Sequence, residues 1–232
     1  MTRRRGTLCA LAALGLSLVT GLAAVPAAQA VTGSPPVTTP DSGTMYPGNA
    51  VFLSPANNDH DPDNDALTIC RLGDEHYRGL ETDFVGNDWA VFSRPSVKPG
   101  TYTFTYYACD FSYLSAGTIT ITVEAAPNIT VKKIASQPGK LRVTNPADIK
   151  IRFLYGSFRE DSPDGSIVID KGASIVIPVH RTRIDWIAYN RKGDVYLGTG
   201  KVLNIKLPAG ASGQAAGRPA LPSRLAEAWR TA

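Results

Sequence analysis

The stretch Thr101-Tyr102-Thr103-Phe104-Thr105-Tyr106 alternates threonines with aromatic residues. Successive side chains of a β-strand point to opposite faces, so the stretch predicts a strand with an aromatic core face and a threonine solvent face. Gly117 to Val123 alternates in the same way. Short β-branched runs separated by Gly, Pro, Asn and Asp are typical of an antiparallel sandwich. We therefore predict one sandwich over residues 47–124.

A second series of strands follows the short joint Ala125-Ala126-Pro127. Turn-forming pairs such as Pro138-Gly139 and Asn145-Pro146 separate its apolar runs. The expected strands are residues 129–134, 140–144, 149–155, 166–169, 174–179, 184–189, 195–197 and 201–207. These runs predict a second sandwich over residues 128–208. The predicted fold class is all-β, with two consecutive antiparallel sandwiches.

The first thirty residues have the pattern of a cleaved export signal. Three arginines, Arg3 to Arg5, precede an apolar run from Leu8 to Val25, and Ala28-Gln29-Ala30 forms an A-x-A cleavage site. The alternative is an uncleaved anchor helix. No other segment approaches the roughly twenty apolar residues needed to span a bilayer. We predict a signal peptide over residues 1–30 and a secreted mature chain without a membrane span.

The segments outside the two sandwiches are rich in small residues and proline. Residues 31–46 predict a flexible or extended leader to the first sandwich. Residues 209–232 predict a disordered tail. The alternative for the tail is a short helix over Ser223 to Arg230, with Leu225 and Trp229 on one side.

The basic charge of the chain belongs largely to the export signal. The formal net charge is +4, and three of the positive charges are Arg3 to Arg5 in a segment without acids, which leaves +1 on the mature chain. This near-neutral balance gives no electrostatic reason to expect nucleic acid or an acidic membrane as a partner.

An acidic loop, residues 57–68, reads NNDHDPDNDALT and sets Asp59, Asp61, Asp63 and Asp65 at alternate positions. Four like charges in so short a segment repel one another, so they are best tolerated beside a cation or in water. Ca²⁺ accepts six to eight oxygen ligands. The loop therefore predicts an extracellular calcium site, and the alternative is a solvated acidic turn.

Residues 53–123 resemble the bacterial cadherin-like, immunoglobulin-like repeats of large surface adhesins. Those repeats open with a loop of the form N-D-x-D-x-D-G-D-x-L and close with F-x-Y-x-x-x-D and a T-x-T-I-T-V strand. The matching positions here are Asn58, Asp59, Asp61, Asp63, Asn64, Asp65 and Leu67, then Phe104, Tyr106 and Asp110, then Thr118 to Val123. The second module resembles immunoglobulin-like sandwiches only in general.

The resemblance implies a calcium site built from Asp59, Asp61, Asp65 and Asp110, with Asp63 or Asn58 as lesser candidates. Asn64 replaces the usual glycine of the loop, and asparagine tolerates the left-handed backbone of such a turn. Two further features depart from the family: the repeat is single, and its two cysteines are outside the family pattern.

The cysteines of the mature chain are Cys70 and Cys109. An even count in an exported protein favours a disulfide, and the alternative is two buried thiols. In the predicted alternation of side chains, both cysteines lie on the polar face of their strands. We therefore predict a bridge near a strand end, close to Asp110 and the acidic loop, instead of one buried between the sheets.

The sequence gives no catalytic signature. Its three histidines, His60, His76 and His180, belong to no G-x-S-x-G, H-E-x-x-H or cysteine–histidine pattern. We predict a non-catalytic cell-envelope or extracellular interaction or adhesion protein, which Ca²⁺ stabilises if the acidic loop binds it. Its expected partner is an extracellular protein or glycan. The alternative is a carbohydrate-binding or inhibitor module that acts on a secreted partner.

Overall fold

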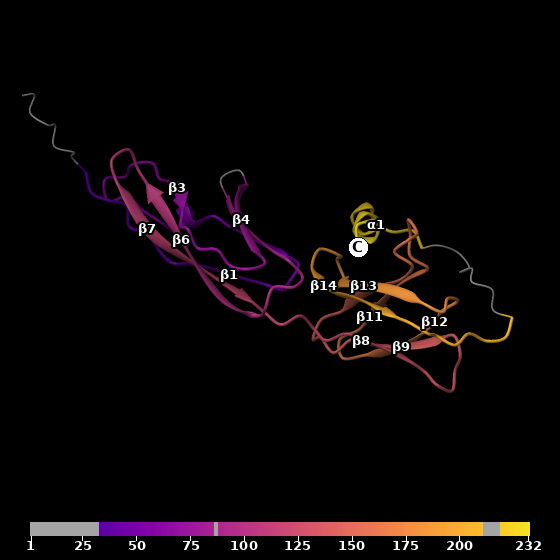
Figure 1. The fold of residues 1–232 in the computed structure, drawn as a ribbon. Helices are drawn as coiled ribbons and strands as arrows, with labels where there is room; N and C mark the ends of the chain where they lie inside the picture. The colour runs from indigo at the N-terminus through magenta and orange to yellow at the C-terminus, as the bar shows by residue number, and fades with distance from the viewer. Residues whose placement is uncertain (1–32, 86–87, 211–218) are drawn as a thin grey trace, which may run out of the picture. The chain divides into compact units, whose positions relative to one another are not determined.

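The computed structural model describes residues 33–85, 88–210 and 219–232, and nearly all of their regular structure is β-strand (Figure 1). This confirms the all-β prediction. The described residues belong to one compact unit. The predicted signal peptide lies outside the described residues. Within them, no helix has the length and apolar character needed to cross a bilayer.

The first sandwich has two sheets around one core. One sheet has the order β1 (Asp41–Met45), β7 (Leu114–Val123), β6 (Gly100–Cys109) and β3 (Thr68–Leu72). The other has the order β2 (Ala50–Leu53), β5 (Asp88–Ser93) and β4 (Leu80–Val85), and a short 3-10 turn, η1 (Pro55–Asn57), follows β2. The largest members of the core are Trp89, Phe104, Tyr106, Ile119 and Ile121.

The alternation of aromatic residues and threonines in β6 places them on opposite faces of the strand, as predicted. Phe104 and Tyr106 are buried, whereas Thr101 and Thr103 are exposed. Tyr106 lies opposite Gly117 of β7, and a β-carbon added at Gly117 would lie 2.2 Å from the tyrosine ring. The glycine therefore provides the space that this core tyrosine occupies.

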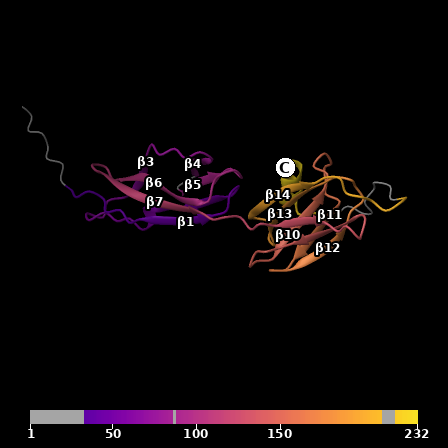
Figure 2. The same cartoon turned by 60° about the horizontal axis from the view of Figure 1, so that its bottom comes forward.

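The second sandwich also has two sheets. One has the order β11 (Gly165–Ile169), β10 (Ile151–Gly156), β13 (Ile184–Asn190) and β14 (Tyr196–Val202) (Figure 2). The other has the order β12 (Ser174–Pro178), β9 (Lys140–Thr144) and β8 (Thr130–Lys133) (Figure 1). Phe153 and Trp186 stack in the core with ring centroids 5.5 Å apart.

The leader forms a strand where flexible chain was expected. Asp41–Met45 is β1, which pairs in parallel with β7 from Asp41↔Ile119 to Met45↔Val123. Val37 forms an isolated bridge with His60. The prediction of a flexible segment over 31–46 is therefore wrong for these residues, because backbone pairing with the edge of β7 outweighs their turn-like composition.

The tail contains the helix α1 (Ser223–Arg230), so the prediction of disorder over 209–232 is wrong for this part and the alternative holds. So short a helix is marginal in water and needs packing to persist. Leu225 and Trp229 are buried, and Trp229 packs with Leu154 of β10 and Ile187 of β13. The helix thus covers apolar residues on the β10–β13 sheet.

In place of the predicted strands 195–197 and 201–207 the structure has one strand, β14 (Tyr196–Val202), and the prediction is wrong for residues 203–207, which lie outside it. Gly198 and Gly200 interrupt the β-propensity of the sequence there, yet the pairing with β13 continues through both. A β-carbon at Gly200 would lie 2.7 Å from the Trp186 ring, so this glycine makes room for the core tryptophan.

Candidate functional site

Asp59 of the acidic loop joins three parts of the first sandwich. Its Oδ1 accepts a hydrogen bond from the backbone N–H of Thr39 at 2.8 Å, and both carboxylate oxygens lie 2.9 Å from the Tyr106 hydroxyl, which donates to them. Burial, the bond to Asp59 and the charge of Asp59 together raise the pKa of Tyr106 well above its ordinary value. Asp59 therefore holds the loop to the core.

Asp61 organises the turn that follows. It is only 7% exposed, and its Oδ1 accepts from the backbone N–H groups of Asp63 at 2.8 Å and Asp65 at 3.2 Å. Asn64 has φ of 62°, the left-handed conformation expected from the sequence. The second oxygen, Oδ2, has no hydrogen-bond partner among the described residues. Asp61 therefore acts within the structure as a turn-forming acceptor.

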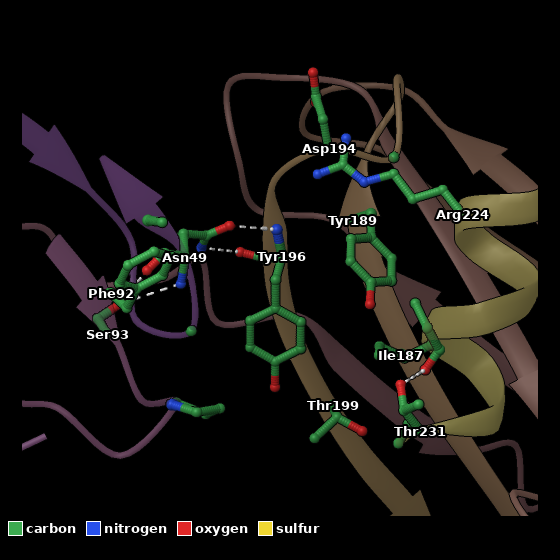
Figure 3. Close-up of a pocket in the computed structure, with 16 residues that line it drawn as sticks. Asn49, Phe92, Ser93, Ile187, Tyr189, Asp194, Tyr196, Thr199, Arg224 and Thr231 are labelled. Atoms are coloured by element: carbon green, nitrogen blue, oxygen red, sulfur yellow. Dashed lines mark hydrogen bonds between the residues drawn. The ribbon is translucent and has the colours of Figure 1, made fainter. Parts of the chain in front are cut away.

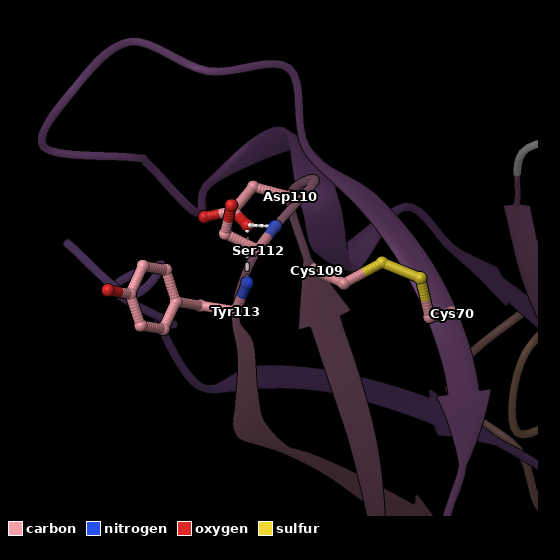
Figure 4. The surroundings of a disulfide bond; sticks show 5 residues. All are labelled: Cys70, Cys109, Asp110, Ser112 and Tyr113. Carbon is pink, nitrogen blue, oxygen red and sulfur yellow. Dashed lines mark hydrogen bonds between the residues drawn. A yellow bond between two sulfur atoms is a disulfide. The ribbon is translucent and has the colours of Figure 1, made fainter. Parts of the chain in front are cut away.

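Asp110 plays the same role in the β6–β7 hairpin. Its Oδ1 accepts from the backbone N–H groups of Ser112 at 2.5 Å and Tyr113 at 2.6 Å, and its own N–H donates to the Tyr113 carbonyl at 3.3 Å (Figure 4). The carboxylate thus fixes the turn Asp110–Tyr113, called the aromatic turn below.

The acidic loop and the aromatic turn meet at one end of the first sandwich. Asp63 accepts a hydrogen bond from the backbone of Ser34. A β-carbon at Gly33 would lie 3.4 Å from both the Asp63 carboxylate and the Tyr113 ring. Both side chains therefore lie against the same glycine.

The predicted calcium ligands do not form a ready cage. Nowhere in the described residues do three or more His, Cys, Asp or Glu side chains gather closely enough to hold a metal ion. Asp59, Asp61 and Asp110 already accept protein hydrogen bonds, while Asp65 is exposed. Calcium binding by the loop stays a prediction, and the function proposed below does not depend on it.

Asp41 is a member of this region that sequence reasoning missed. It lies at the start of β1, and its Oδ1 accepts a hydrogen bond from the Asn58 side chain at 3.1 Å. Burial raises the pKa of Asp41, the Asp59 charge raises it further, and the Asn58 hydrogen bond opposes both effects. Only the pairing of β1 with β7 brings Asp41 here, and no local sequence pattern signals that pairing.

The predicted disulfide is present and lies at the base of the aromatic turn. Cys70 of β3 and Cys109 of β6 are bonded, with Cα atoms 6.0 Å apart (Figure 4). The bridge joins neighbouring strands of one sheet, and the β3–β6 pairing shifts register between Ile69 and Arg71. Cys70 lies within this β-bulge. The bulge changes the direction of its side chain, so that a cysteine predicted on the polar face of the strand can bond to Cys109.

Apolar side chains project from this braced end. Phe111, in the aromatic turn, is 92% exposed, and Leu114, the first residue of β7, is 49% exposed. Scattered apolar residues are common on protein surfaces, but a phenylalanine with nearly all of its surface in water is not. The turn hydrogen bonds and the disulfide fix the backbone that carries it.

A separate pocket of about 580 Å³ lies beside β13, β14 and α1 (Figure 3). Its lining residues that carry polar groups or rings are Asn49, Phe92, Ser93, Tyr189, Asp194, Tyr196, Thr199, Arg224 and Thr231. The Asn49 side chain donates to the Tyr196 carbonyl at 2.8 Å and accepts from the Tyr196 N–H at 2.7 Å. This reciprocal pair fixes the backbone of β14 at the rim of the pocket.

Two tyrosines form the wall of the pocket on the second sandwich. The Tyr189 and Tyr196 rings meet edge to face, with centroids 5.9 Å apart. Burial raises the pKa of both phenols, so both hydroxyls are protonated at neutral pH. The lining has one carboxylate side chain, Asp194, and no histidine or cysteine. Such a lining is suited to binding by packing and hydrogen bonds.

A family model for the bacterial Ig domain matches residues 33–124. The first sandwich is therefore similar to bacterial Ig domains. The match begins before β1, so the matched region includes the strand that the sequence analysis assigned to the leader. The resemblance to bacterial immunoglobulin-like repeats is thereby confirmed. No curated protein matches the chain.

Among solved structures, an endo-fucoidan hydrolase of glycoside hydrolase family 107 is 13% identical, with a TM-score of 0.32, over 77% of this chain and 30% of that chain. A SusE-like surface-located polysaccharide-binding protein from the Bacteroides thetaiotaomicron heparin utilisation locus is 11% identical, with a TM-score of 0.35, over 72% of this chain and 33% of that chain. The titin Ig tandem A164–A165 is 13% identical, with a TM-score of 0.26, over 76% of this chain and 98% of that chain. The chain thus spans about a third of the first two proteins.

Proposed function

We propose that the protein is a secreted, non-catalytic interaction protein of the bacterial cell envelope or its surroundings, which binds an extracellular protein through the aromatic turn. Three features support the proposal: the export signal read from residues 1–30, the similarity of the first sandwich to bacterial Ig domains, and the presentation of Phe111. The last of these carries it, because an Ig domain alone does not indicate where a partner binds.

Phe111 has the properties of an interface anchor. An aromatic side chain contributes a large contact area, and rigid presentation reduces the conformational entropy lost on binding. Asp110 fixes the turn with two hydrogen bonds, and the Cys70–Cys109 bridge braces the strand that leads into it. The complementary surface on the partner is an apolar pocket that accepts one phenyl ring.

The acidic residues beside the aromatic turn indicate which kind of residue surrounds the apolar pocket on the partner. Asp63 and Asp65 are exposed, and Asp63 lies with Tyr113 against Gly33. Acidic groups at the edge of an interface favour basic residues on the partner and increase the association rate at low salt. We therefore expect a basic rim around the apolar pocket.

The experiment starts with the mature protein as bait for culture supernatant and envelope extract, with and without EDTA. The captured protein is purified, and its Kd is measured for the wild type, Phe111→Ala and Phe84→Ala. Phe84 is the matched control, because it is an exposed phenylalanine on β4. Truncation of a hot-spot aromatic costs about 2 kcal/mol or more, which is roughly thirtyfold in Kd. Equal affinities for wild type and Phe111→Ala, or glycan binding without any protein partner, would overturn the proposal.

The second candidate function is carbohydrate binding, which the pocket favours. Its lining combines aromatic rings with hydroxyl, amide and guanidinium groups, and a sugar ring offers apolar C–H faces and many hydroxyls to such a lining. The pocket and the aromatic turn share no residue. The two functions can therefore be tested separately in one protein.

A further inference from the structure

We propose that the pocket beside β13, β14 and α1 binds an acidic saccharide, with Arg224 as the partner of a uronate carboxylate. The inference rests on the second candidate function and specifies its ligand class. A volume of about 580 Å³ falls within the range of small-molecule sites.

The aromatic wall supplies the packing surface. Tyr189 and Tyr196 are half-buried and meet edge to face, and Phe92, at another part of the lining, is 39% exposed. Aromatic rings of this kind pack against apolar faces and keep a polar end available, as tyrosine does at binding interfaces. The C–H face of a pyranose ring fits against this wall.

The tyrosine hydroxyls supply hydrogen-bonding capacity. No described residue forms a hydrogen bond with the hydroxyl of Tyr189 or Tyr196, although both rings are half-buried. Figure 3 shows both hydroxyls on the side of the pocket where Thr199 lies. A hydroxyl both donates and accepts, which matches the hydroxyls of a sugar. A polar ligand therefore meets groups that the protein leaves available.

Arg224 supplies the charge. It is exposed at the start of α1, and within the described part of the chain it forms neither a hydrogen bond nor an ion pair. Its charge contributes to the lowered pKa of Asp194, after larger effects from the Asn190 hydrogen bond, the backbone and Lys192. A guanidinium presents a planar fork of donors that matches a carboxylate. An acidic sugar can accept hydrogen bonds from this guanidinium with a full negative charge, whereas a neutral sugar cannot.

Packing of α1 fixes the position of Arg224. Trp229 is fully buried, its indole N–H donates to the Glu160 carbonyl at 2.9 Å, and its ring meets Phe158 at 4.7 Å. Leu225, next to Arg224, lies 3.0 Å from the position that a β-carbon would take at Gly193. The helix therefore carries the guanidinium on a well-packed element.

The test uses the mature protein and two saccharide probes with the same sugar backbone, one with free carboxylates and one without: tetragalacturonate and its fully methyl-esterified form. Calorimetry or NMR titration measures the affinity for each. We expect the wild type to bind the acid at least about tenfold more tightly than the ester, and Arg224→Gln to bind the two probes with equal affinity. Arg142→Gln, at an exposed position on β9, is the matched control and keeps the preference.

Equal affinity of the wild type for acid and ester would overturn the inference and leave carbohydrate binding in place. A preference that persists in Arg224→Gln would also overturn it. Binding of neither probe at millimolar concentration would overturn it together with the second candidate function. Phe111→Ala should bind both probes like the wild type, so the outcome here is independent of the protein-partner proposal.

Discussion

The indole N–H of Trp229 donates a hydrogen bond to the backbone carbonyl of Glu160, 69 residues earlier in the chain. This bond, together with the burial of the ring, attaches the tail to the second sandwich. The helix has little stability without it, because eight residues are too few to form a stable helix in water.

Trp229→Ala should release α1 from the sandwich. We expect amide protection across residues 223–230 to disappear, while the core strands β10 and β13 keep theirs. Truncation of a buried tryptophan in the core of a domain lowers the free energy of unfolding by about 3–5 kcal/mol. Hydrogen exchange followed by mass spectrometry checks the result, with Ser223→Ala at an exposed helix position as the control. Unchanged protection in Trp229→Ala would contradict the packing described here.

Replacement of both Cys70 and Cys109 by serine should destabilise the first sandwich. The sequence separation is 39 residues, which corresponds to about 4 kcal/mol in the chain-entropy account of disulfides. Urea unfolding of the wild type and the double variant measures the difference in the free energy of unfolding. Reduction of the unfolded wild type should add the mass of two hydrogen atoms, and an unchanged mass would show that the cysteines are not bridged.

The Tyr106–Asp59 pair should make stability depend on alkaline pH. Burial, followed by the Asp59 hydrogen bond and charge, raises the pKa of Tyr106 in the folded state. A raised pKa means that the stabilisation is fully present below the unfolded value of about 10 and is lost as pH rises toward the folded value.

We therefore expect Tyr106→Phe to lose less stability than the wild type between neutral pH and pH about 11. Burial also raises the pKa of Tyr155, Tyr189 and Tyr196, so Tyr155→Phe serves as a reference for a buried phenol without an aspartate bond. Denaturant unfolding at several pH values in this range gives the slope of the free energy of unfolding against pH for each protein. Identical slopes for Tyr106→Phe and wild type would contradict the prediction.

Gly117→Ala should destabilise the first sandwich by steric conflict alone. The added β-carbon would lie 2.2 Å from the Tyr106 ring, so the core must shift. Overpacking of this kind costs roughly 1–3 kcal/mol, and occasionally more. The neighbouring Thr118→Ala, at an exposed position of β7, controls for strand propensity. Thermal unfolding compares the two variants, and a smaller loss for Gly117→Ala would be evidence against the packing.

The calcium prediction made from the sequence has a direct test. If calcium binds the acidic loop, millimolar calcium raises the Tm of the mature protein, EDTA reverses the rise, and Asp61→Ala or Asp110→Ala abolishes it. Differential scanning calorimetry measures the shift. A constant Tm from EDTA to millimolar calcium would leave these carboxylates with the hydrogen-bonding roles seen in the structure.

Alternating hydrophobicity was sufficient to predict both sandwiches, because strands such as β6 and β7 bury one face and expose the other. β1 could not be predicted in this way, since only Met45 of its five residues is buried and its stability comes from pairing with β7. The break predicted between residues 197 and 201 is wrong, because Gly198 and Gly200 both keep their pairing with β13, and Gly200 makes room for the Trp186 ring.

The candidate sites differ in how far the sequence predicts them. The disulfide near Asp110 follows from cysteine count and strand parity, and the left-handed Asn64 follows from its place in the acidic loop. The pocket does not, because Phe92, Tyr189 and Arg224 come from three distant segments. Their proximity depends on tertiary packing, which no local pattern encodes.

The parallel pairing of β1 with β7 also matters for how fragments of this protein are made. With β1 in place, the hydrogen-bonding edge of β7 from Ile119 to Val123 is covered. A fragment that starts at Pro47 would leave that edge bare, and uncovered strand edges recruit other chains. Expression trials that begin after Met45 should therefore give aggregated material, while those that keep residues 33–46 should stay monodisperse.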